Sequence, residues 1–181
     1  NYRGNWSPYI PRNIILKYSK EGENILDCFC GSGVTGVESK LLNRNFIGRD
    51  INPQAIQLSK ENIDLIPKTQ LGETNETDVK VGDARDLPFL KNNSIHLICA
   101  HPPYANILQY TDNSKQDLSF LKIDDFLENM VEVAKENYRV LDKERFCAIL
   151  IGDMRKEKHV IPLGFRLIDV YLQNGFVLKE L

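Results

Sequence analysis

A glycine-rich stretch and a carboxylate placed 19 residues after its start are the first features of this chain that could bind a small molecule. Residues 31–36 read GSGVTG, which satisfies the pattern G-x-G-x-x-G, and the acid is Asp50. Glycines let the backbone approach a ligand closely, and a carboxylate after the second strand accepts hydrogen bonds from ribose hydroxyls. The pattern predicts a site for an adenosine-bearing cofactor. The alternative is a turn that serves only the close packing of a helix on a strand.

Two further strand ends carry residues suited to a binding site. Asp83 and Ala84 close the third predicted strand, where the acid could accept a hydrogen bond from an adenine amino group, and residues 101–104 (HPPY) close the fourth. Ligands of open parallel sheets bind outside the carboxyl ends of the strands. We therefore expect the glycine-rich turn, Asp50, Asp83 and residues 101–104 to face one crevice.

The elements that position these residues follow from short apolar runs that alternate with longer amphipathic stretches, a pattern that predicts an α/β fold with a mostly parallel sheet. The predicted strands are residues 24–29, 45–51, 79–84, 94–101, 145–152 and 176–181. The predicted helices are residues 34–42, 53–64, 125–138 and 162–173, with a further one over roughly 13–18. Asn52 caps the helix that begins at Pro53, and a D-x-x-E capping box at Asp125 begins another.

The composition excludes several classes of protein. The 181 residues are 42% hydrophobic and 27% charged, with a formal charge of −2, which is typical of a globular domain and not of a coiled coil or a disordered chain. Without a basic excess, any nucleic-acid contact must use local patches, and the basic stretch at residues 155–159 is one candidate. No apolar run approaches the roughly 20 residues that cross a bilayer. The four cysteines predict neither a disulfide framework nor a metal site.

Three motifs, in their order along the chain, resemble those of the amino-methylating nucleic-acid methyltransferases. These enzymes use S-adenosylmethionine and modify adenine N6 or cytosine N4. Residues 27–35 (DCFCGSGVT) resemble the cofactor motif D-x-F-x-G-S-G-T-T, and residues 101–104 resemble the catalytic motif [D/N/S]-P-P-[Y/F/W]. Residues 6–12 (WSPYIPR) are similar to the proline-containing cofactor segment. The resemblance covers nearly the whole chain.

The resemblance implies a Rossmann-like class I methyltransferase fold, with helices on both faces of a mostly parallel, twisted sheet. Because the strand predicted at 176–181 has no partner strand after it, we expect the sheet to be cut short there. The cofactor-binding residues that it implies, together with those found above, are Trp6, Ser7, Pro8, Pro11, Asp27, Cys28, Phe29, Gly31, Ser32, Gly33, Thr35, Asp50, Ile51, Asp83 and Ala84. The catalytic residues are His101, Pro102, Pro103 and Tyr104.

The tetrapeptide has a chemical rationale. An exocyclic amine is a poor nucleophile because its lone pair is delocalised into the ring, and accepting its two N–H bonds returns electron density to the nitrogen. The carbonyl of Pro102 and the side chain of His101 would accept these bonds, while Tyr104 would stack on a base turned out of the duplex. His101 replaces the usual Asp, Asn or Ser, and only a neutral imidazole accepts a hydrogen bond, so we expect activity to fall in acid.

We expect one methyltransferase domain over residues 1–181, with a cofactor-binding segment at 1–20, a cofactor half at 24–84 and a catalytic half at 94–181. Its substrate would be double-stranded DNA, with cytosine or adenine left open. Target recognition would come from short loops, from a region that continues beyond residue 181, or from a partner subunit. A cytoplasmic protein of bacterial, archaeal or phage origin is expected.

Other functions remain open. Methylation of RNA or of a protein glutamine amide would use a similar site, and a catalytically silent, cofactor-binding subunit would carry the same cofactor motif. A nicotinamide-dependent dehydrogenase is disfavoured, because nothing near the predicted crevice supplies a hydride-transfer acid in place of residues 101–104.

Overall fold

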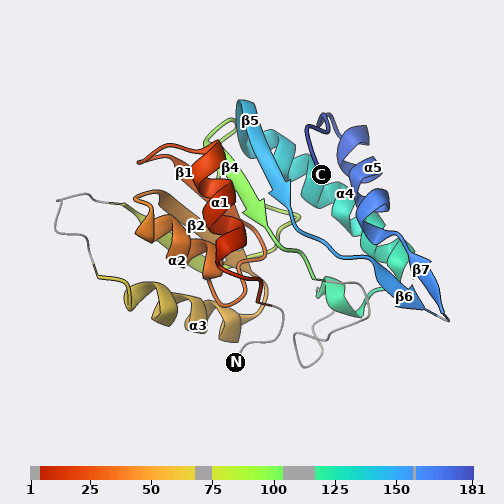
Figure 1. Ribbon diagram of the computed structural model, residues 1–181, viewed down its shortest axis with the longest axis horizontal. Helices are drawn as coiled ribbons and strands as arrows, with labels where there is room; N and C mark the ends of the chain where they lie inside the picture. The colour runs from red at the N-terminus through yellow and green to blue at the C-terminus, as the bar shows by residue number, and fades with distance from the viewer. Residues whose placement is uncertain (1–4, 68–74, 104–116, 157) are drawn as a thin grey trace.

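The computed structural model of the chain describes residues 5–67, 75–103, 117–156 and 158–181. Its centre is a five-stranded parallel sheet in the order β3-β2-β1-β4-β5 (Figure 1). The strands are β1 (Asn24–Asp27), β2 (Asn45–Asp50), β3 (Thr77–Val81), β4 (Ile95–Ala100) and β5 (Leu141–Ile149). The chain order reverses between β1 and β4, which is where parallel sheets of this kind bind ligands.

Helices cover both faces of the sheet and enclose two apolar cores. The helices are α1 (Tyr9–Tyr18), α2 (Val34–Leu41), α3 (Pro53–Asp64), α4 (Ile123–Val140) and α5 (Leu163–Gln173). On one face, Ile15 of α1 and Ile63 of α3 pack with Phe46 of the sheet. On the other, Met130 of α4 and Leu167 of α5 pack against the sheet, so neither face of the central strands meets solvent.

Two smaller elements lie near the carboxyl ends of the strands. The 3₁₀ helix η1 (Leu118–Phe120) precedes α4. The strands β6 (Met154–Lys156) and β7 (His159–Ile161) form an antiparallel hairpin between β5 and α5. In Figure 1 this hairpin projects beyond the end of β5 that the arrowhead marks.

Local sequence signals predicted most of these elements. Asn52 caps α3 by accepting a hydrogen bond from the backbone N–H of Gln54, with Pro53 in the first turn. The α4 stripe of Phe126 and Met130 is buried as the periodicity predicts. Among the described residues, no helix is long and apolar enough to cross a membrane.

The starts of two helices were predicted wrongly. The capping box at Asp125 is wrong, because α4 begins at Ile123 and its cap residue Lys122 makes no side-chain capping bond. Helix α1 begins at Tyr9 and not near residue 13. Proline is tolerated in a first turn, where a backbone N–H has no partner within the helix, so Pro11 does not delay the start.

Three predicted strands differ from the structure by more than two residues at one end or do not form. Strand β3 spans Thr77–Val81 instead of 79–84, because it pairs with β2 only as far as Asp50. Strand β5 begins at Leu141, before the predicted 145, since this edge strand tolerates polar residues there. The strand predicted at 176–181 does not form, and the ring of Phe176 instead packs against Tyr138 and Tyr171.

Candidate cofactor and catalytic site

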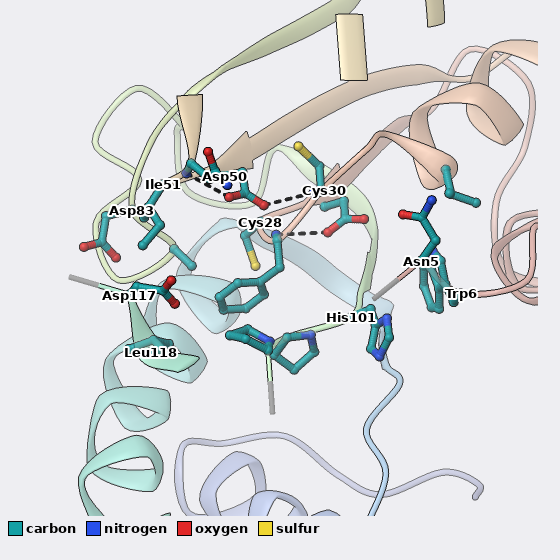
Figure 2. A pocket seen from close by; sticks show the side chains of 18 residues that line it. Asn5, Trp6, Cys28, Cys30, Asp50, Ile51, Asp83, His101, Asp117 and Leu118 are labelled. Atoms are coloured by element: carbon teal, nitrogen blue, oxygen red, sulfur yellow. Dashed lines mark hydrogen bonds between the residues drawn. The ribbon is translucent and has the colours of Figure 1, made fainter. Parts of the chain in front are cut away.

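A pocket opens at the carboxyl ends of β1, β2 and β4 (Figure 2). It contains about 800 Å³ of empty space, including solvent at its mouth. The lining residues are Asn5, Trp6, Asp27, Cys28, Phe29, Cys30, Gly31, Val34, Asp50, Ile51, Asn52, Asp83, Ala84, His101, Pro102, Pro103, Asp117 and Leu118.

The sequence offered two roles for the glycine-rich turn, close approach to a ligand and close packing of secondary structure, and different glycines of the turn suit each role. Gly31 lies in the pocket wall with a φ of 50°. Gly33, with a φ of 85°, is the N-cap residue of α2, and a Cβ there would lie 2.3 Å from the Ser59 Oγ and 3.0 Å from the Ser59 Cα. Gly33 is therefore required for the packing of α2 on α3, while Gly31 faces the space that a ligand would fill.

Asp50 ties the end of β2 to this turn. Its Oδ2 accepts a hydrogen bond from the backbone N–H of Gly31 at 2.9 Å, and its Oδ1 accepts one from Asn52 at 2.9 Å. Burial raises the pKa of Asp50, although both backbone bonds act in the opposite direction. Because each carboxylate oxygen has two lone pairs, acceptor capacity remains for a ligand.

Asp27 ends β1 as a buried carboxyl group held by its own turn. The Thr35 hydroxyl donates to its Oδ2 at 2.6 Å, and the backbone N–H of Phe29 donates to its Oδ1 at 3.0 Å. Burial raises the pKa of Asp27 to about 7, although the two hydrogen bonds act to lower it. The negative charge of Asp50 adds to the increase. Asp27 therefore changes charge near neutral pH, and a cation in the pocket would favour its ionised form.

Asp83 follows β3 and is held by an ion pair. The Arg85 guanidinium donates to both carboxylate oxygens, with an Nη2 to Oδ2 distance of 2.6 Å, and also donates to Asn129 of α4. Partial burial raises the pKa of Asp83, but the hydrogen bonds and charge of Arg85 outweigh it, and the net shift is downward. An ionised carboxylate is thus fixed at the end of the pocket near Ile51 (Figure 2).

His101 stands on the side of the pocket opposite Asp83 (Figure 2). Its imidazole stacks on the indole ring of Trp6, with ring centroids 5.5 Å apart and planes inclined by 25°. Pro102 and Pro103 also line the pocket, so the chain after β4 shares this pocket with Gly31. Tyr104 lies outside the described residues.

Most of the predicted site residues line the pocket. Two of the others, Thr35 and Ser32, hold lining residues in place through hydrogen bonds. Those outside the lining are Ser7, Pro8, Pro11, Ser32, Gly33 and Thr35. Thr35 holds Asp27, and the Ser32 hydroxyl donates to the Asn5 Oδ1 at 2.5 Å, which joins the N-terminal segment to the turn. The part that Ser7, Pro8 and Pro11 play in binding stays a prediction.

The prediction missed six lining residues: Asn5, Cys30, Val34, Asn52, Asp117 and Leu118. Four of them adjoin predicted motif residues, and widening each motif by one position would have included them. Asp117 and Leu118 carry no motif, and only the tertiary structure brings them to the pocket.

The described part of the chain offers no metal centre, because it contains no group of three or more His, Cys, Asp or Glu side chains that could hold an ion. Burial raises the pKa of the Cys28 and Cys30 thiols well above the ordinary value. These thiols therefore remain protonated and unreactive at neutral pH.

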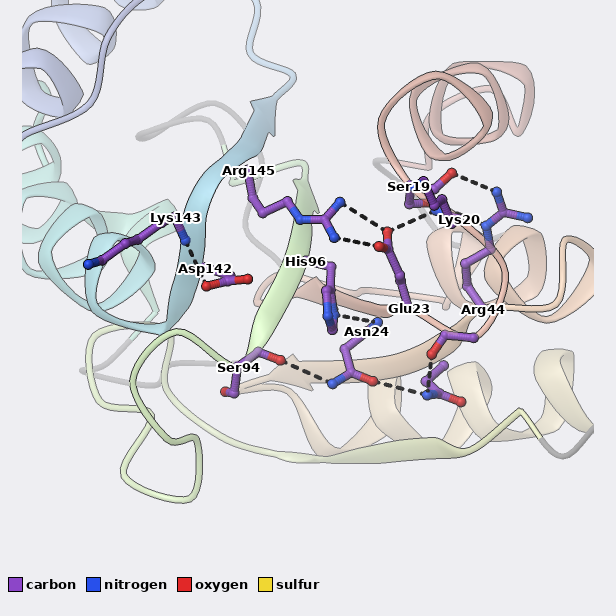
Figure 3. Close-up of polar contacts among 12 residues, drawn as sticks. Ser19, Lys20, Glu23, Asn24, Arg44, Ser94, His96, Asp142, Lys143 and Arg145 are labelled. Carbon is purple, nitrogen blue, oxygen red and sulfur yellow. Dashed lines mark hydrogen bonds and ion pairs between the residues drawn. The ribbon is translucent and has the colours of Figure 1, made fainter.

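A second polar cluster lies at the opposite, amino-terminal edge of the sheet (Figure 3). Glu23 pairs with the Arg145 guanidinium of β5, and the backbone N–H of Asn24 donates to the His96 Nδ1 at 3.0 Å. The Glu23–Arg145 ion pair and the Asn24–His96 hydrogen bond tie β1, β4 and β5 together at this edge. This is a structural role.

Comparisons with known proteins agree with this geometry. Residues 4–61 match the model of a DNA methylase family, N6_N4_Mtase. The type II methyltransferase M.BglI of Bacillus subtilis is 34% identical over 42% of this chain and 23% of its own length. The tRNA (guanine(10)-N2)-dimethyltransferase of Methanothermobacter thermautotrophicus is 31% identical over 58% of this chain and 29% of its own. The matched segments thus span under a third of these relatives.

Among solved structures, a TehB-like SAM-dependent methyltransferase from Corynebacterium glutamicum superposes with a TM-score of 0.59 at 18% identity, over 91% of this chain and 71% of its own. The fold is therefore the Rossmann-like class I methyltransferase fold, as predicted. The predicted resemblance to amino-methylating DNA methyltransferases is also confirmed, on the cofactor segment and glycine-rich turn that the family match covers. That match ends before residue 101.

Proposed function

We propose that this chain is the catalytic domain of a DNA methyltransferase, which transfers a methyl group from S-adenosylmethionine to the exocyclic amine of cytosine N4 or adenine N6. The observation that carries the proposal is the placement of residues 101–103 in the same pocket as the glycine-rich turn and its carboxylates. Residues 1–84 hold the cofactor in this proposal, and residues 94–181 provide the catalytic half.

The donor groups of the cofactor fit the acceptors of the pocket. Asp50 accepts from the ribose hydroxyls and Asp83 from the adenine amino group, while Asp27 faces the cationic end of the cofactor. S-adenosylmethionine supplies a methyl group activated by a sulfonium charge. An acidic pocket stabilises that positive charge through the electrostatic attraction between opposite charges in a partly water-excluded site.

The residues after β4 hold the amine that is methylated. The Pro102 carbonyl accepts one N–H, and the imidazole of His101, oriented by its stack on Trp6, accepts the other. Proline fixes φ at its own positions, which limits the movement of this carbonyl. Catalysis then consists mainly of positioning the nitrogen, which is an effect of proximity and orientation. The protein forms no covalent bond with its substrate.

Double-stranded DNA is the proposed substrate, with the target base turned out of the duplex so that its amine reaches the pocket. Recognition of the target site is assigned to loops near the pocket, to a further region of the protein, or to a partner subunit. The proposal includes a cytoplasmic location and a bacterial, archaeal or phage origin, in which such an enzyme would meet DNA.

Methyl transfer from radiolabelled S-adenosylmethionine to DNA, RNA and protein, measured in parallel, tests the proposal. Label in DNA is expected, and mass spectrometry of the digested nucleosides then identifies N4-methylcytosine or N6-methyladenine. His101→Ala should lower kcat by about a hundredfold, as loss of one positioned hydrogen-bonding group does. His101→Asn, which keeps an acceptor, should retain most activity. Unchanged cofactor affinity in both variants would show that only the acceptor had been altered.

A second candidate substrate is an exocyclic guanine amine in RNA. The relative that methylates tRNA matches a larger share of this chain than M.BglI does, and the chemistry at the nitrogen is the same. Label in RNA and none in DNA would favour it. Label in neither, with tight cofactor binding, would favour a catalytically silent subunit.

A further inference from the structure

Asp117 is a pocket carboxylate that comes from the catalytic half of the chain. Only 4% of its surface is exposed, and its Oδ1 accepts a hydrogen bond from the backbone N–H of Ser119 at 2.9 Å. This bond caps η1, whose first residue Leu118 is buried in the core beneath α4. Asp117 is therefore held in place by the packing of its own helix, and it cannot easily swing away from the pocket.

The position of Asp117 indicates which part of a ligand it meets. In Figure 2 it lies on the side of the pocket that holds Ile51 and Asp83, away from His101 and Trp6. Burial raises the pKa of Asp50, and the charge of Asp117 adds to that increase, so the two carboxylates interact electrostatically. Asp117 thus belongs to the end of the pocket that the proposed function assigns to ribose and adenine.

The charges of the lining favour a ligand rich in hydrogen-bond donors. Four aspartates line the pocket, and no Lys or Arg is among the described residues of its lining. Burying a carboxylate is costly unless hydrogen-bond donors compensate it. Ribose and adenine together offer several O–H and N–H donors, which suit a pocket lined by carboxylates.

We propose that Asp117 accepts a hydrogen bond from the nucleoside half of the cofactor, so that the catalytic half of the chain completes the cofactor site. The inference rests on the proposed function, because it takes an adenosine-bearing cofactor as the ligand. It implies that η1 and α4 are linked to cofactor binding.

The variant Asp117→Asn separates this role from capping, since asparagine caps a helix about as well as aspartate. Isothermal titration calorimetry of the full chain with S-adenosylmethionine and with S-adenosylhomocysteine measures the effect. The two ligands share the nucleoside and differ in sulfur charge. We expect Asp117→Asn to weaken both by about tenfold, as expected for loss of a charge-assisted hydrogen bond. Asp125→Asn is the matched control, an exposed acid in the first turn of α4 that should change neither affinity.

Other outcomes of the calorimetry would contradict the inference or the proposed function. Unchanged affinity in Asp117→Asn overturns the inference, and so does a loss confined to S-adenosylmethionine, since that would place Asp117 against the sulfonium. If the wild-type chain binds neither ligand, the proposed function fails and the inference fails with it. Circular dichroism melting checks that the variant is folded. Asp117→Ser, which also retains a good cap, provides a second charge-free variant with the same expected loss.

Discussion

The indole ring of Trp6 stacks on the imidazole ring of His101, and so joins the segment before α1 to the residue that follows β4. The two residues are far apart in sequence, and each belongs to a different motif. Trp6 is 9% exposed and packs in the same core as Ile15 and Cys99, which makes it a rigid support. In the proposed reaction, the stack orients the imidazole toward the amine and makes Trp6 a positioning residue.

Replacement of Trp6 by alanine should therefore impair catalysis as well as stability. We expect Trp6→Ala to lower kcat by about tenfold through misplacement of His101, and to lower the free energy of unfolding by about 3–5 kcal/mol. Trp6→Phe, which keeps an aromatic face, should restore most of kcat. Steady-state kinetics and urea denaturation measure the two effects. A folded Trp6→Ala protein with wild-type kcat would contradict the positioning role.

Cofactor binding should depend on pH through Asp27, whose pKa is about 7. A bound cation favours the carboxylate and lowers this pKa, so binding releases a proton at pH values below 7. Affinity for S-adenosylmethionine should then rise by about tenfold between pH 6 and pH 8, and level off above that range.

Calorimetry in two buffers of different ionisation enthalpy measures the released proton directly. Asp27→Asn should bind more weakly and show no change of affinity over the same pH range. The role of Asp27 would be refuted by wild-type affinity that stays constant from pH 6 to pH 8.

Gly33 and Gly22 provide a matched pair for testing the turn, because both have a positive φ but differ in surroundings. A Cβ at Gly33 would meet Ser59 within 2.3 Å, whereas a Cβ at Gly22 has nothing within 4 Å. Gly22→Ala should cost only the strain of a left-handed alanine, about 1–2 kcal/mol. Gly33→Ala adds overpacking and should cost about 1–3 kcal/mol more. Equal urea midpoints for the two variants would show that α2 adjusts without cost.

The β6–β7 hairpin should contact the DNA backbone if DNA is the substrate. Arg155 and Lys158 are exposed on it, beyond the sheet edge at which the pocket opens. Replacing both by alanine should raise the KM for DNA and leave kcat unchanged. The dependence of log affinity on log salt should become shallower by about one per lost phosphate contact.

The matched control for the hairpin is the double variant Lys20→Ala, Lys143→Ala, which removes two exposed charges at the opposite edge of the sheet (Figure 3). It should leave the KM for DNA unchanged. An equal effect of the two double variants would indicate that only net charge matters, and would remove the hairpin from the proposed interface.

Signals that act over a few residues were enough to predict much of the fold. The Asn52–Pro53 start of α3, the apolar stripe of α4 and the buried runs of β1 and β4 are each stabilised by neighbours in sequence or by burial of an obvious apolar face. Where a boundary depended on pairing with a distant strand, the prediction was less accurate. Strand β3 stops where β2 stops, and β5 begins at Leu141 because Ile95 pairs with it.

The sequence by itself determined the class of fold and the residues of the two strand-end motifs, since a glycine-rich turn and an acid after a strand must meet at one sheet edge once the strands are parallel. Tertiary structure alone decided that Trp6 supports His101 and that Asp117 lies in the same pocket as Asp50. The physical reason is that these relationships join segments distant in the chain, and they form only when α1 and η1 pack onto the completed sheet.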